Sequence, residues 1–229
     1  MNNFSKCQSG KWTCTKKACP GVCAAWGQGH YKTFDDKMFD FTGNCEYILA
    51  KGYMSDTDSF TITVKNVPCG TTSVTCSKAI TINIGTGAEK EIVNLVNGEE
   101  TLLGNSFKRL LKSFWLFAII KMFKEFPSRI MKRDVGMFVS FEVSDMGVVI
   151  QWDKRNRLYI RLKPTWRNNV KGLCGNFNSD NSDDFQTPSG IIEASNDLFG
   201  DTWKLYKYCP KAVTVQVELK CKVLNYFDF

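Results

Sequence analysis

Ten cysteines and a single histidine, His30, stand in this chain of 229 residues. Scattered cysteines at this density favour disulfides and an oxidising, extracytoplasmic compartment, because cytosolic thiols are kept reduced. Structural zinc is the alternative, since four cysteines lie close together: Cys7, Cys14, Cys19 and Cys23. Their spacing lacks the paired C-x2-C arrangement of structural zinc sites. We therefore expect an extracellular fold that is stapled by disulfides. In small folds of this kind, disulfides supplement a modest core.

Short runs with a period of two residues predict the secondary structure. They are FTITV (60–64), AITINI (79–84), MFVSFEV (137–143), VVIQW (148–152) and RLYIRL (157–162). Turn residues such as Asp, Asn and Gly separate these runs, which is typical of antiparallel strands in hairpins. Several hairpins in one chain favour an all-β sandwich or barrel. Any helices should be short and lie near the C-terminal side, around SNDLFGDTW.

Residues 106–126 break this pattern. They carry +4 of the net charge of +7, so the rest of the surface is close to neutral, and we expect no nucleic-acid partner. Their uninterrupted apolar core, 114–120, is too short to span a bilayer. One interpretation is a cationic amphipathic helix on a membrane surface. The others are an insertion that packs on the domain, or sequence that is foreign to the mature protein.

The N-terminal stretch MNNFSKCQSG lacks the apolar core of a signal peptide. Disulfides nevertheless indicate secretion. We therefore expect this chain to be an internal piece of a longer secreted protein, or an incomplete version of one.

The stretch GLCGNFNSDNSDDF, residues 172–185, gathers short oxygen-bearing side chains. Calcium takes six to eight oxygen ligands, and five positions here offer them: Asn176, Asn178, Asp180, Asp183 and Asp184. The loop lacks the glycine and the bidentate glutamate of an EF-hand, and strand patterns flank it. The alternative is a run of Asx turns, which the same residue types favour. Carboxylates this close repel each other unless a cation or solvent screens them.

Catalysis finds little support in the sequence. A Ser-His-Asp or Cys-His arrangement would have to use His30, and no nucleophile motif accompanies it. His30 precedes a tyrosine at the start of a strand-like pattern, so we interpret it as a structural histidine. The adjacent acids Asp35 and Asp36 are a weak glycosidase signal without a cleft. We expect no catalytic residues.

Three stretches resemble a known family, the von Willebrand factor type D domain. They are CAAWGQGHYKTFDDKMFDFTGNCEYILA (23–50), NVPCGTTSVTCSKAI (66–80), and GLCGNFNSDNSDDF followed by FGDTWKLYKYC (199–209). The second is most similar to the cysteine hairpin in the third D assembly of gel-forming, secreted mucins. The resemblance implies a D domain over 23–209 with an atypical insertion at 106–126. Residues 1–22 resemble the tail of a small cysteine-rich module, and 210–229 match nothing in the family.

The resemblance implies a β-sandwich of the type D kind that is calcium-bound and disulfide-stapled, with a few short helices. Carried over by position, the calcium ligands are Asp35, Asn176, Asn178, Asp183 and Asp184, with Asp180 contributing its main-chain carbonyl. Asp36 stands where the family has glycine, which would strain the turn if its φ is positive.

Disulfide pairs carry over in the same way. The resemblance implies Cys23 with Cys174, Cys45 with Cys209, and Cys69 with Cys76. It assigns no partner to Cys7, Cys14, Cys19 or Cys221.

These implications add up to a secreted, extracellular, non-enzymatic structural module of a gel-forming mucin-like glycoprotein. Its partners would be other domains of the same or like chains, in a polymer or mucus gel. One alternative is a type D binding module of a non-mucin extracellular matrix or adhesion glycoprotein. Another is a membrane-active protein that works through residues 106–126.

Overall fold

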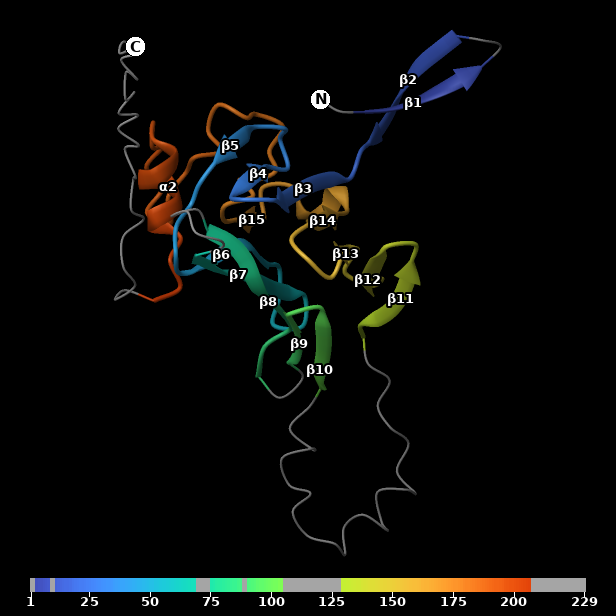
Figure 1. Cartoon of the computed structure of the whole chain (residues 1–229). Coiled ribbons are helices and arrows are strands. Elements are labelled where there is room, and N and C mark those ends of the chain that lie inside the picture. The colour runs from blue at the N-terminus through green and yellow to red at the C-terminus, as the bar shows by residue number, and fades with distance from the viewer. Residues whose placement is uncertain (1–2, 9–10, 69–74, 88–89, 105–128, 207–229) are drawn as a thin grey trace, which may run out of the picture.

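The computed structural model describes residues 3–8, 11–68, 75–87, 90–104 and 129–206. Two larger antiparallel sheets face each other, and a separate two-stranded hairpin projects at the N-terminal side (Figure 1). That hairpin consists of β1 (Asn3–Gln8) and β2 (Lys11–Ala18). The expected insertion at 106–126 and the expected tail at 210–229 lie outside the described residues.

The first large sheet has six strands in the order β10-β9-β8-β7-β6-β15. They are β6 (Glu46–Tyr53), β7 (Ser59–Pro68), β8 (Thr75–Ile84), β9 (Glu91–Val96), β10 (Glu99–Gly104) and β15 (Val170–Lys171). Strands β6 to β10 pair antiparallel with their neighbours in chain order, and two of them, β7 and β8, contain the predicted runs 60–64 and 79–84. The late strand β15 returns to pair with β6.

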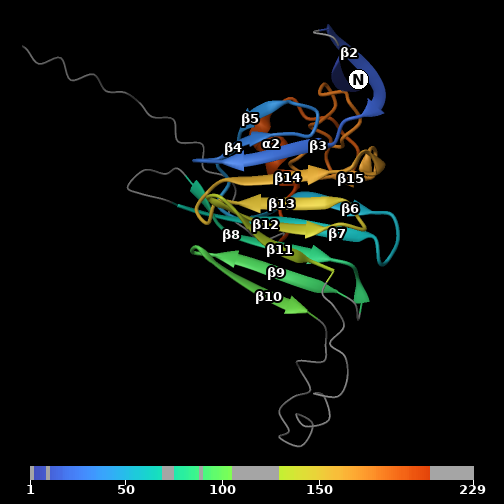
Figure 2. The same ribbon diagram turned by 90° about the vertical axis from the view of Figure 1, so that its right-hand side faces the viewer.

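The second sheet has seven strands in the order β11-β12-β13-β14-β3-β4-β5. They are β3 (Gly21–Trp26), β4 (His30–Lys32), β5 (Met38–Asp40), β11 (Met131–Val135), β12 (Phe138–Val143), β13 (Val148–Trp152) and β14 (Leu158–Leu162). Strand β14 pairs with β3, so the middle of this sheet joins the two ends of the domain. Figure 2 shows β11 to β14 in front of β6 and β7, with β9 and β10 below them.

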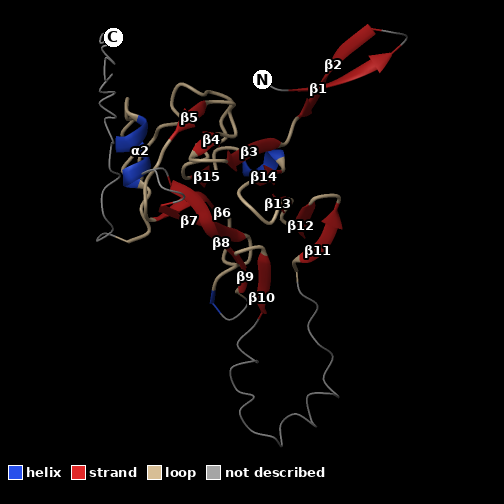
Figure 3. Cartoon of the chain, in the orientation of Figure 1, coloured by secondary structure: helices blue, strands red, loops and turns tan. Residues whose placement is uncertain are grey.

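The core fills the space between these two sheets. Alternate residues of the predicted strands are buried as the sequence indicates: Phe60, Ile62, Val64, Ile80, Ile82, Ile84, Leu158, Ile160 and Leu162. Burial of apolar side chains from both sheets in one cluster is the main favourable term for this fold. The predicted all-β antiparallel sandwich is confirmed (Figure 3).

Aromatic side chains at one end of the sandwich hold the connections in place. Trp166, from the short 3-10 helix η3 (Pro164–Trp166), meets Phe60 of β7 edge to face with ring centroids 4.8 Å apart. Its indole Nε1 donates to the carbonyl of Met146 at 2.8 Å, so a buried polar group is satisfied. This packing fixes η3 next to the loop that follows β15.

The short helix α2 (Asn196–Thr202) confirms the expectation around SNDLFGDTW. Ser195 caps it by accepting from the backbone N–H of Leu198. Phe199 stacks on Phe185 at 4.6 Å, so the helix closes over the end of the oxygen-rich loop.

The boundary drawn after residue 22 falls inside β3. Gly21 and Val22 pair with Leu162 and Arg161 of β14, so they belong to the seven-stranded sheet. A side chain at Gly21 would collide with the ring of Phe177, at 2.6 Å. Close approach of the sheet to the loop at Phe177 therefore requires glycine there.

Candidate metal centre

The oxygen-rich loop starts from a firmly held backbone. Leu173 and Cys174 donate their N–H groups to Ile48 and Leu49 of β6, at 3.1 and 2.8 Å. Gly172 has φ 144°, and a Cβ there would lie 2.4 Å from the carbonyl oxygen of Leu49. The chain therefore enters the loop pressed against the six-stranded sheet.

A disulfide ties the same point to the opposite sheet. Cys23 of β3 and Cys174 are bonded, with Cα atoms 5.6 Å apart, which is the usual spacing. This pair matches the one implied by the resemblance. Both cysteines are buried, so the bond forms part of the core.

The turn between β4 and β5 brings Asp35 to the loop. Phe34 donates its N–H to the carbonyl of Cys174 at 3.0 Å, which holds the turn beside the disulfide. The Asp35 carboxylate then accepts from the backbone N–H groups of Asn178, at 2.9 Å, and Ser179, at 2.7 Å. Residues more than 140 positions apart in sequence are thus in direct contact.

Asp183 gathers the two asparagines of the loop. The Asn176 amide nitrogen donates to its Oδ1 at 3.0 Å, and that of Asn178 donates to its Oδ2 at 2.8 Å. The backbone adopts left-handed conformations directly after each asparagine, at Phe177, φ 55°, and Ser179, φ 75°. Such turns fold the loop so that alternate side chains converge.

Asp184 lies deepest in the cluster, with 1% of its surface exposed. Its Oδ2 accepts from the Thr33 hydroxyl at 2.6 Å, and its Oδ1 lies 3.4 Å from the backbone nitrogen of Asn176. Gly175, with φ 77°, makes room, because a Cβ there would lie 2.0 Å from Asp184 Oδ1. Burial, with repulsion from Asp35 and Asp183, raises the pKa of the Asp184 carboxyl to about 6.

Asp35 shows the same balance in weaker form. Burial raises the pKa of its carboxyl, and repulsion from Asp183 adds to this. Hydrogen bonds from Ser179 and Asn178 and the charge of Arg167 act in the opposite direction. The site therefore holds three mutually repelling carboxylates in a partly desolvated place.

Asp180 stands apart from these groups. Its carboxylate is exposed and accepts from the backbone and the hydroxyl of Ser182, which lowers its pKa. Its N–H donates to the Asn178 amide oxygen at 2.6 Å. The side chain thus shapes the turn, which leaves its main-chain carbonyl as the group that the resemblance assigns to an ion.

The donor set fits a calcium ion only if all its members are counted. Among the described residues, no three His, Cys, Asp or Glu side chains are close enough to hold an ion by themselves. An ion would also need amide oxygens from Asn176 and Asn178, whose amide groups must turn so that oxygen faces inward. Oxygens of both kinds are usual calcium ligands, and three carboxylates suit a divalent charge. The residues present therefore fit a hard cation.

Two residues of this site, Thr33 and Arg167, were not predicted from the sequence pattern around them. Thr33 is a fully buried hydroxyl that orients Asp184, and its signal in the sequence is its place before Phe34 and Asp35 in the Thr-Phe-Asp stretch. Arg167 donates to the Ser179 hydroxyl at 2.5 Å. Nothing around Arg167 in the sequence distinguishes it from an ordinary surface arginine.

The other predicted disulfides lie partly outside the described residues. Cys45 is disulfide-bonded, and its implied partner, Cys209, is beyond the described part. Cys76 lies in β8 opposite Val67, whereas its implied partner Cys69 is not among the described residues. Cys19 makes no disulfide in the structure.

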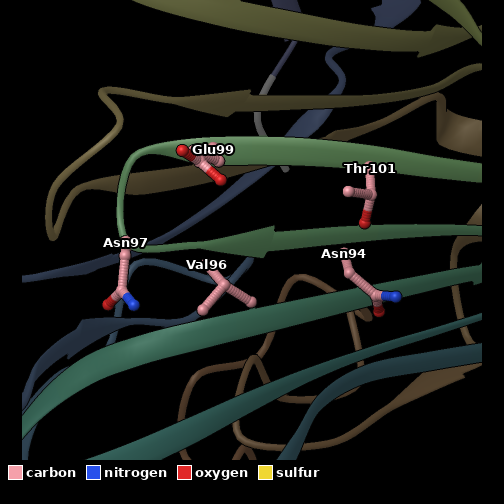
Figure 4. Close-up of a pocket in the computed structure, with 5 residues that line it drawn as sticks. All are labelled: Asn94, Val96, Asn97, Glu99 and Thr101. Carbon is pink, nitrogen blue, oxygen red and sulfur yellow. The ribbon is translucent and has the colours of Figure 1, made fainter.

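Two surface hollows among the described residues are lined by none of the predicted site residues. A surface hollow of about 470 Å³ on the β9–β10 hairpin is lined by Asn94, Val96, Asn97, Glu99 and Thr101 (Figure 4). Another, of about 370 Å³, lies over β3, β4 and β14 beside Trp26 and Tyr159.

His30 begins β4 and contacts Asp40 through Nδ1 at 2.6 Å. The ring is half exposed and lies beside Trp26, with centroids 5.9 Å apart. These contacts agree with the structural role expected for His30. Within the described residues, no helix is long and apolar enough to cross a membrane.

Comparison with known proteins gives the same relationship as the motifs. Hemocytin of Bombyx mori is 43% identical over 211 residues, which is 91% of this chain and 6% of hemocytin. Mucin-2 of Rattus norvegicus is 39% identical over 91% of this chain and 12% of its own length. SCO-spondin of Gallus gallus is 32% identical over 96% of this chain and 4% of its own length. The chain thus spans a small part of these relatives.

A family model described as von Willebrand factor type D domain matches residues 23–191. That range contains both large sheets apart from the first two residues of β3, the disulfide between Cys23 and Cys174, and the whole oxygen-rich loop. The chain belongs to the von Willebrand factor type D domain family.

Proposed function

We propose that this chain is a calcium-stabilised structural module of a secreted, mucin-like glycoprotein. It would act without catalysis, by contact with other domains of the same or like chains. The relatives named mucins and the type D family support this assignment. Its placement in the third D assembly rests on the stretch 66–80 and stays a prediction.

One observation carries the calcium assignment: the contact of Asp35 with the loop at Asn178 and Ser179. It gathers Asp35 with Asp183 and Asp184, whose carboxylates repel one another. Asp35, Asp183 and Asp184, the amide oxygens of Asn176 and Asn178, and the Asp180 carbonyl would hold the ion. The bound ion would neutralise the carboxylates and join the β4–β5 turn to the loop after β15.

The decisive experiment compares thermal unfolding of the oxidised, secreted chain in calcium and in EDTA. The same scans are run on the double variant Asp183→Asn, Asp184→Asn. We expect calcium to raise the midpoint of the wild type, because a ligand that binds only the folded state stabilises it. The double variant should lose this rise. An equal midpoint in calcium and EDTA for well-folded wild type would contradict the ion.

A binding module of a non-mucin matrix or adhesion glycoprotein is the second candidate. It is favoured by relatives whose names are not mucins, hemocytin and SCO-spondin. Long tracts rich in Thr, Ser and Pro elsewhere in the full-length chain would decide for a mucin. Their absence from the complete chain would decide for the second candidate.

Self-association tests the assembly part of the proposal. Light scattering of the oxidised chain in calcium, over a range of concentrations, measures its molar mass. A mass that rises with concentration supports domain-to-domain contact, and a constant monomer mass contradicts self-contact by this piece alone.

A further inference from the structure

Arg167 sits beside the proposed calcium site without belonging to its ligands. It directly follows η3, and its N–H donates back to the carbonyl of Pro164 at 3.1 Å. The next backbone N–H, of Asn168, lies 3.4 Å from the carbonyl of Phe177. The η3 connection is therefore tied to the oxygen-rich loop, and Arg167 is placed by backbone contacts on both sides.

The guanidinium group contacts two residues of the loop and also acts on Asp35 in the β4–β5 turn. Its Nη1 donates to the Ser179 hydroxyl at 2.5 Å. Its plane lies over the Phe177 ring, 5.1 Å from the centroid, at the distance of a cation–π contact. Its charge attracts the Asp35 carboxylate, which also accepts from the Ser179 N–H. One cation thus contacts Phe177 and Ser179 of the loop and acts on the proposed ligand Asp35.

Two other cations near the loop make contacts with residues that are not proposed ligands. Lys32 forms an ion pair with Asp36 at 2.7 Å, and Lys37 lies over the Phe185 ring at 3.8 Å. In the described part of the chain, Arg167 is the cation whose charge acts on Asp35. Its Nε is buried and has no hydrogen-bond partner there, so charge and the Ser179 bond are its main polar interactions.

We propose that Arg167 is a built-in counter-cation of this loop, which holds the carboxylate cluster together in the metal-free protein and lowers its affinity for calcium. The proposal rests on the proposed function, because it concerns the same site. A fixed positive charge that acts on Asp35 offsets part of the repulsion between Asp35 and the other two carboxylates when no other cation is bound. The same charge repels an incoming divalent ion, and the repulsion is strong where water is partly excluded. Arg167 would therefore set the calcium concentration at which the site fills.

Two substitutions separate its charge from its geometry. Arg167→Gln removes the charge and keeps a donor for the Ser179 hydroxyl. Arg167→Lys keeps the charge and loses the planar group that covers Phe177. Arg155→Gln is the matched control: it removes one positive charge in the exposed turn between β13 and β14, at the other end of the sheet from the loop. All are made in the full, oxidised chain.

Calcium affinity is measured by titration calorimetry, and stability by thermal unfolding in EDTA. We expect Arg167→Gln to bind calcium about three- to tenfold more tightly than wild type, from loss of one like charge near the ion. We also expect its midpoint in EDTA to fall, so that the rise on adding calcium becomes larger. Arg167→Lys and Arg155→Gln should bind calcium as wild type does.

The outcomes distinguish this proposal from the proposed function. Calcium binding by wild type and Arg167→Gln with equal affinity would overturn the role of Arg167 and leave the calcium site standing. Weaker binding by Arg167→Gln would also overturn it, because Arg167 would then only position the loop. Absence of calcium binding in wild type and in every variant would contradict the calcium site itself, and with it the effect on affinity.

Discussion

At the scale of single residues, Asp36 shows how a substitution in the family pattern is accommodated. The residue has φ 68°, a left-handed conformation that glycine adopts freely. Its carboxylate pairs with Lys32 at 2.7 Å on the exposed side of the turn. The strain foreseen from the sequence is therefore present, and an exposed ion pair of small value accompanies it.

Asp36→Gly should stabilise the protein by about 0.5–1 kcal/mol, because removal of the Cβ relieves the left-handed strain. Urea unfolding measures the change. Asp36→Ala serves as the control, since it keeps the Cβ and loses the ion pair, and it should be destabilising. A lower stability for Asp36→Gly than for wild type would show that the turn carries no strain.

The titration of Asp184 should make the stability of the protein depend on pH, and the direction of this dependence should differ with and without calcium. Its folded pKa of about 6 lies above the ordinary carboxyl value. Its contribution to stability in EDTA is therefore fully present below about pH 4 and is lost as the pH rises through about 6. Calcium reverses this trend, because the ion favours the ionised carboxylate.

The measurement is the midpoint of unfolding in EDTA from about pH 4 to about pH 7.5, for wild type and Asp184→Asn. The unfolding midpoint of the wild type minus that of Asp184→Asn should fall as the pH rises across this range. Calcium affinity of the wild type should rise over the same range. A difference that stays constant with pH would mean that Asp184 titrates normally in the folded protein.

The positions of the proposed ligands follow from the motifs, whereas the residues that surround them do not. Asp35 and Asp183 follow from motif positions, and the structure brings both into one cluster. The role of Thr33 depends on a hydrogen bond from its hydroxyl to the carboxylate of Asp184, which lies 151 positions away in the sequence. The role of Arg167 depends on the path of η3, which the residue directly follows. Neither long-range contact leaves a local pattern in the sequence.

At the scale of secondary-structure elements, the alternation of apolar and polar residues predicted strands correctly where the strands are long and one face is buried. Strands β7, β8 and β14 bury the expected side chains. Strands β5 and β15 have three and two residues, too few for alternation to be recognised. All five residues of β11 are exposed, so its sequence shows no buried face.

Arg129 links elements that belong to different sheets. Its guanidinium donates to Asp145 Oδ2 at 2.6 Å in the β12–β13 turn, and to the carbonyl of Thr57 at 2.7 Å in the β6–β7 turn. It also lies 3.3 Å from Asp58. One side chain therefore fastens the same end of both sheets.

Arg129→Met should destabilise the fold by about 1–2 kcal/mol, a value that allows for the partly exposed carboxylates. Chemical unfolding at moderate salt is the measurement. Arg133→Met is the matched control, because Arg133 is exposed and lies 3.8 Å from Glu142. Equal effects of the two substitutions would show that the bridge between the sheets contributes nothing specific.

At the scale of the whole molecule, strand order was beyond reach of the sequence. Strand β3 lies between β14 and β4, so residues 21–25 pair with residues 158–162. Periodicity indicates that each strand exists, but gives no information on a partner so distant. The resemblance supplied what periodicity lacks, because it implied that Cys23 and Cys174 are bonded.

Replacing both Cys23 and Cys174 by alanine should destabilise the protein strongly, by up to about 5 kcal/mol in the chain-entropy treatment. The large value follows from the sequence separation of 151 residues. Cys19→Ala, which breaks no disulfide in the structure, should change stability by less than about 0.5 kcal/mol. Denaturant unfolding under non-reducing conditions compares them. A small effect of the double substitution would show that the packing of the two sheets holds the two ends of the domain together without the disulfide.

The bond between Cys23 and Cys174 also determines how the module responds to tension in a longer chain. Pulling force applied at residues before 23 and after 174 passes through the sulfur atoms and bypasses the strands between these two cysteines. The enclosed segment, which spans 151 positions and would extend to about 500 Å if stretched, stays slack under load. The sandwich would keep its shape while only its outer segments extend.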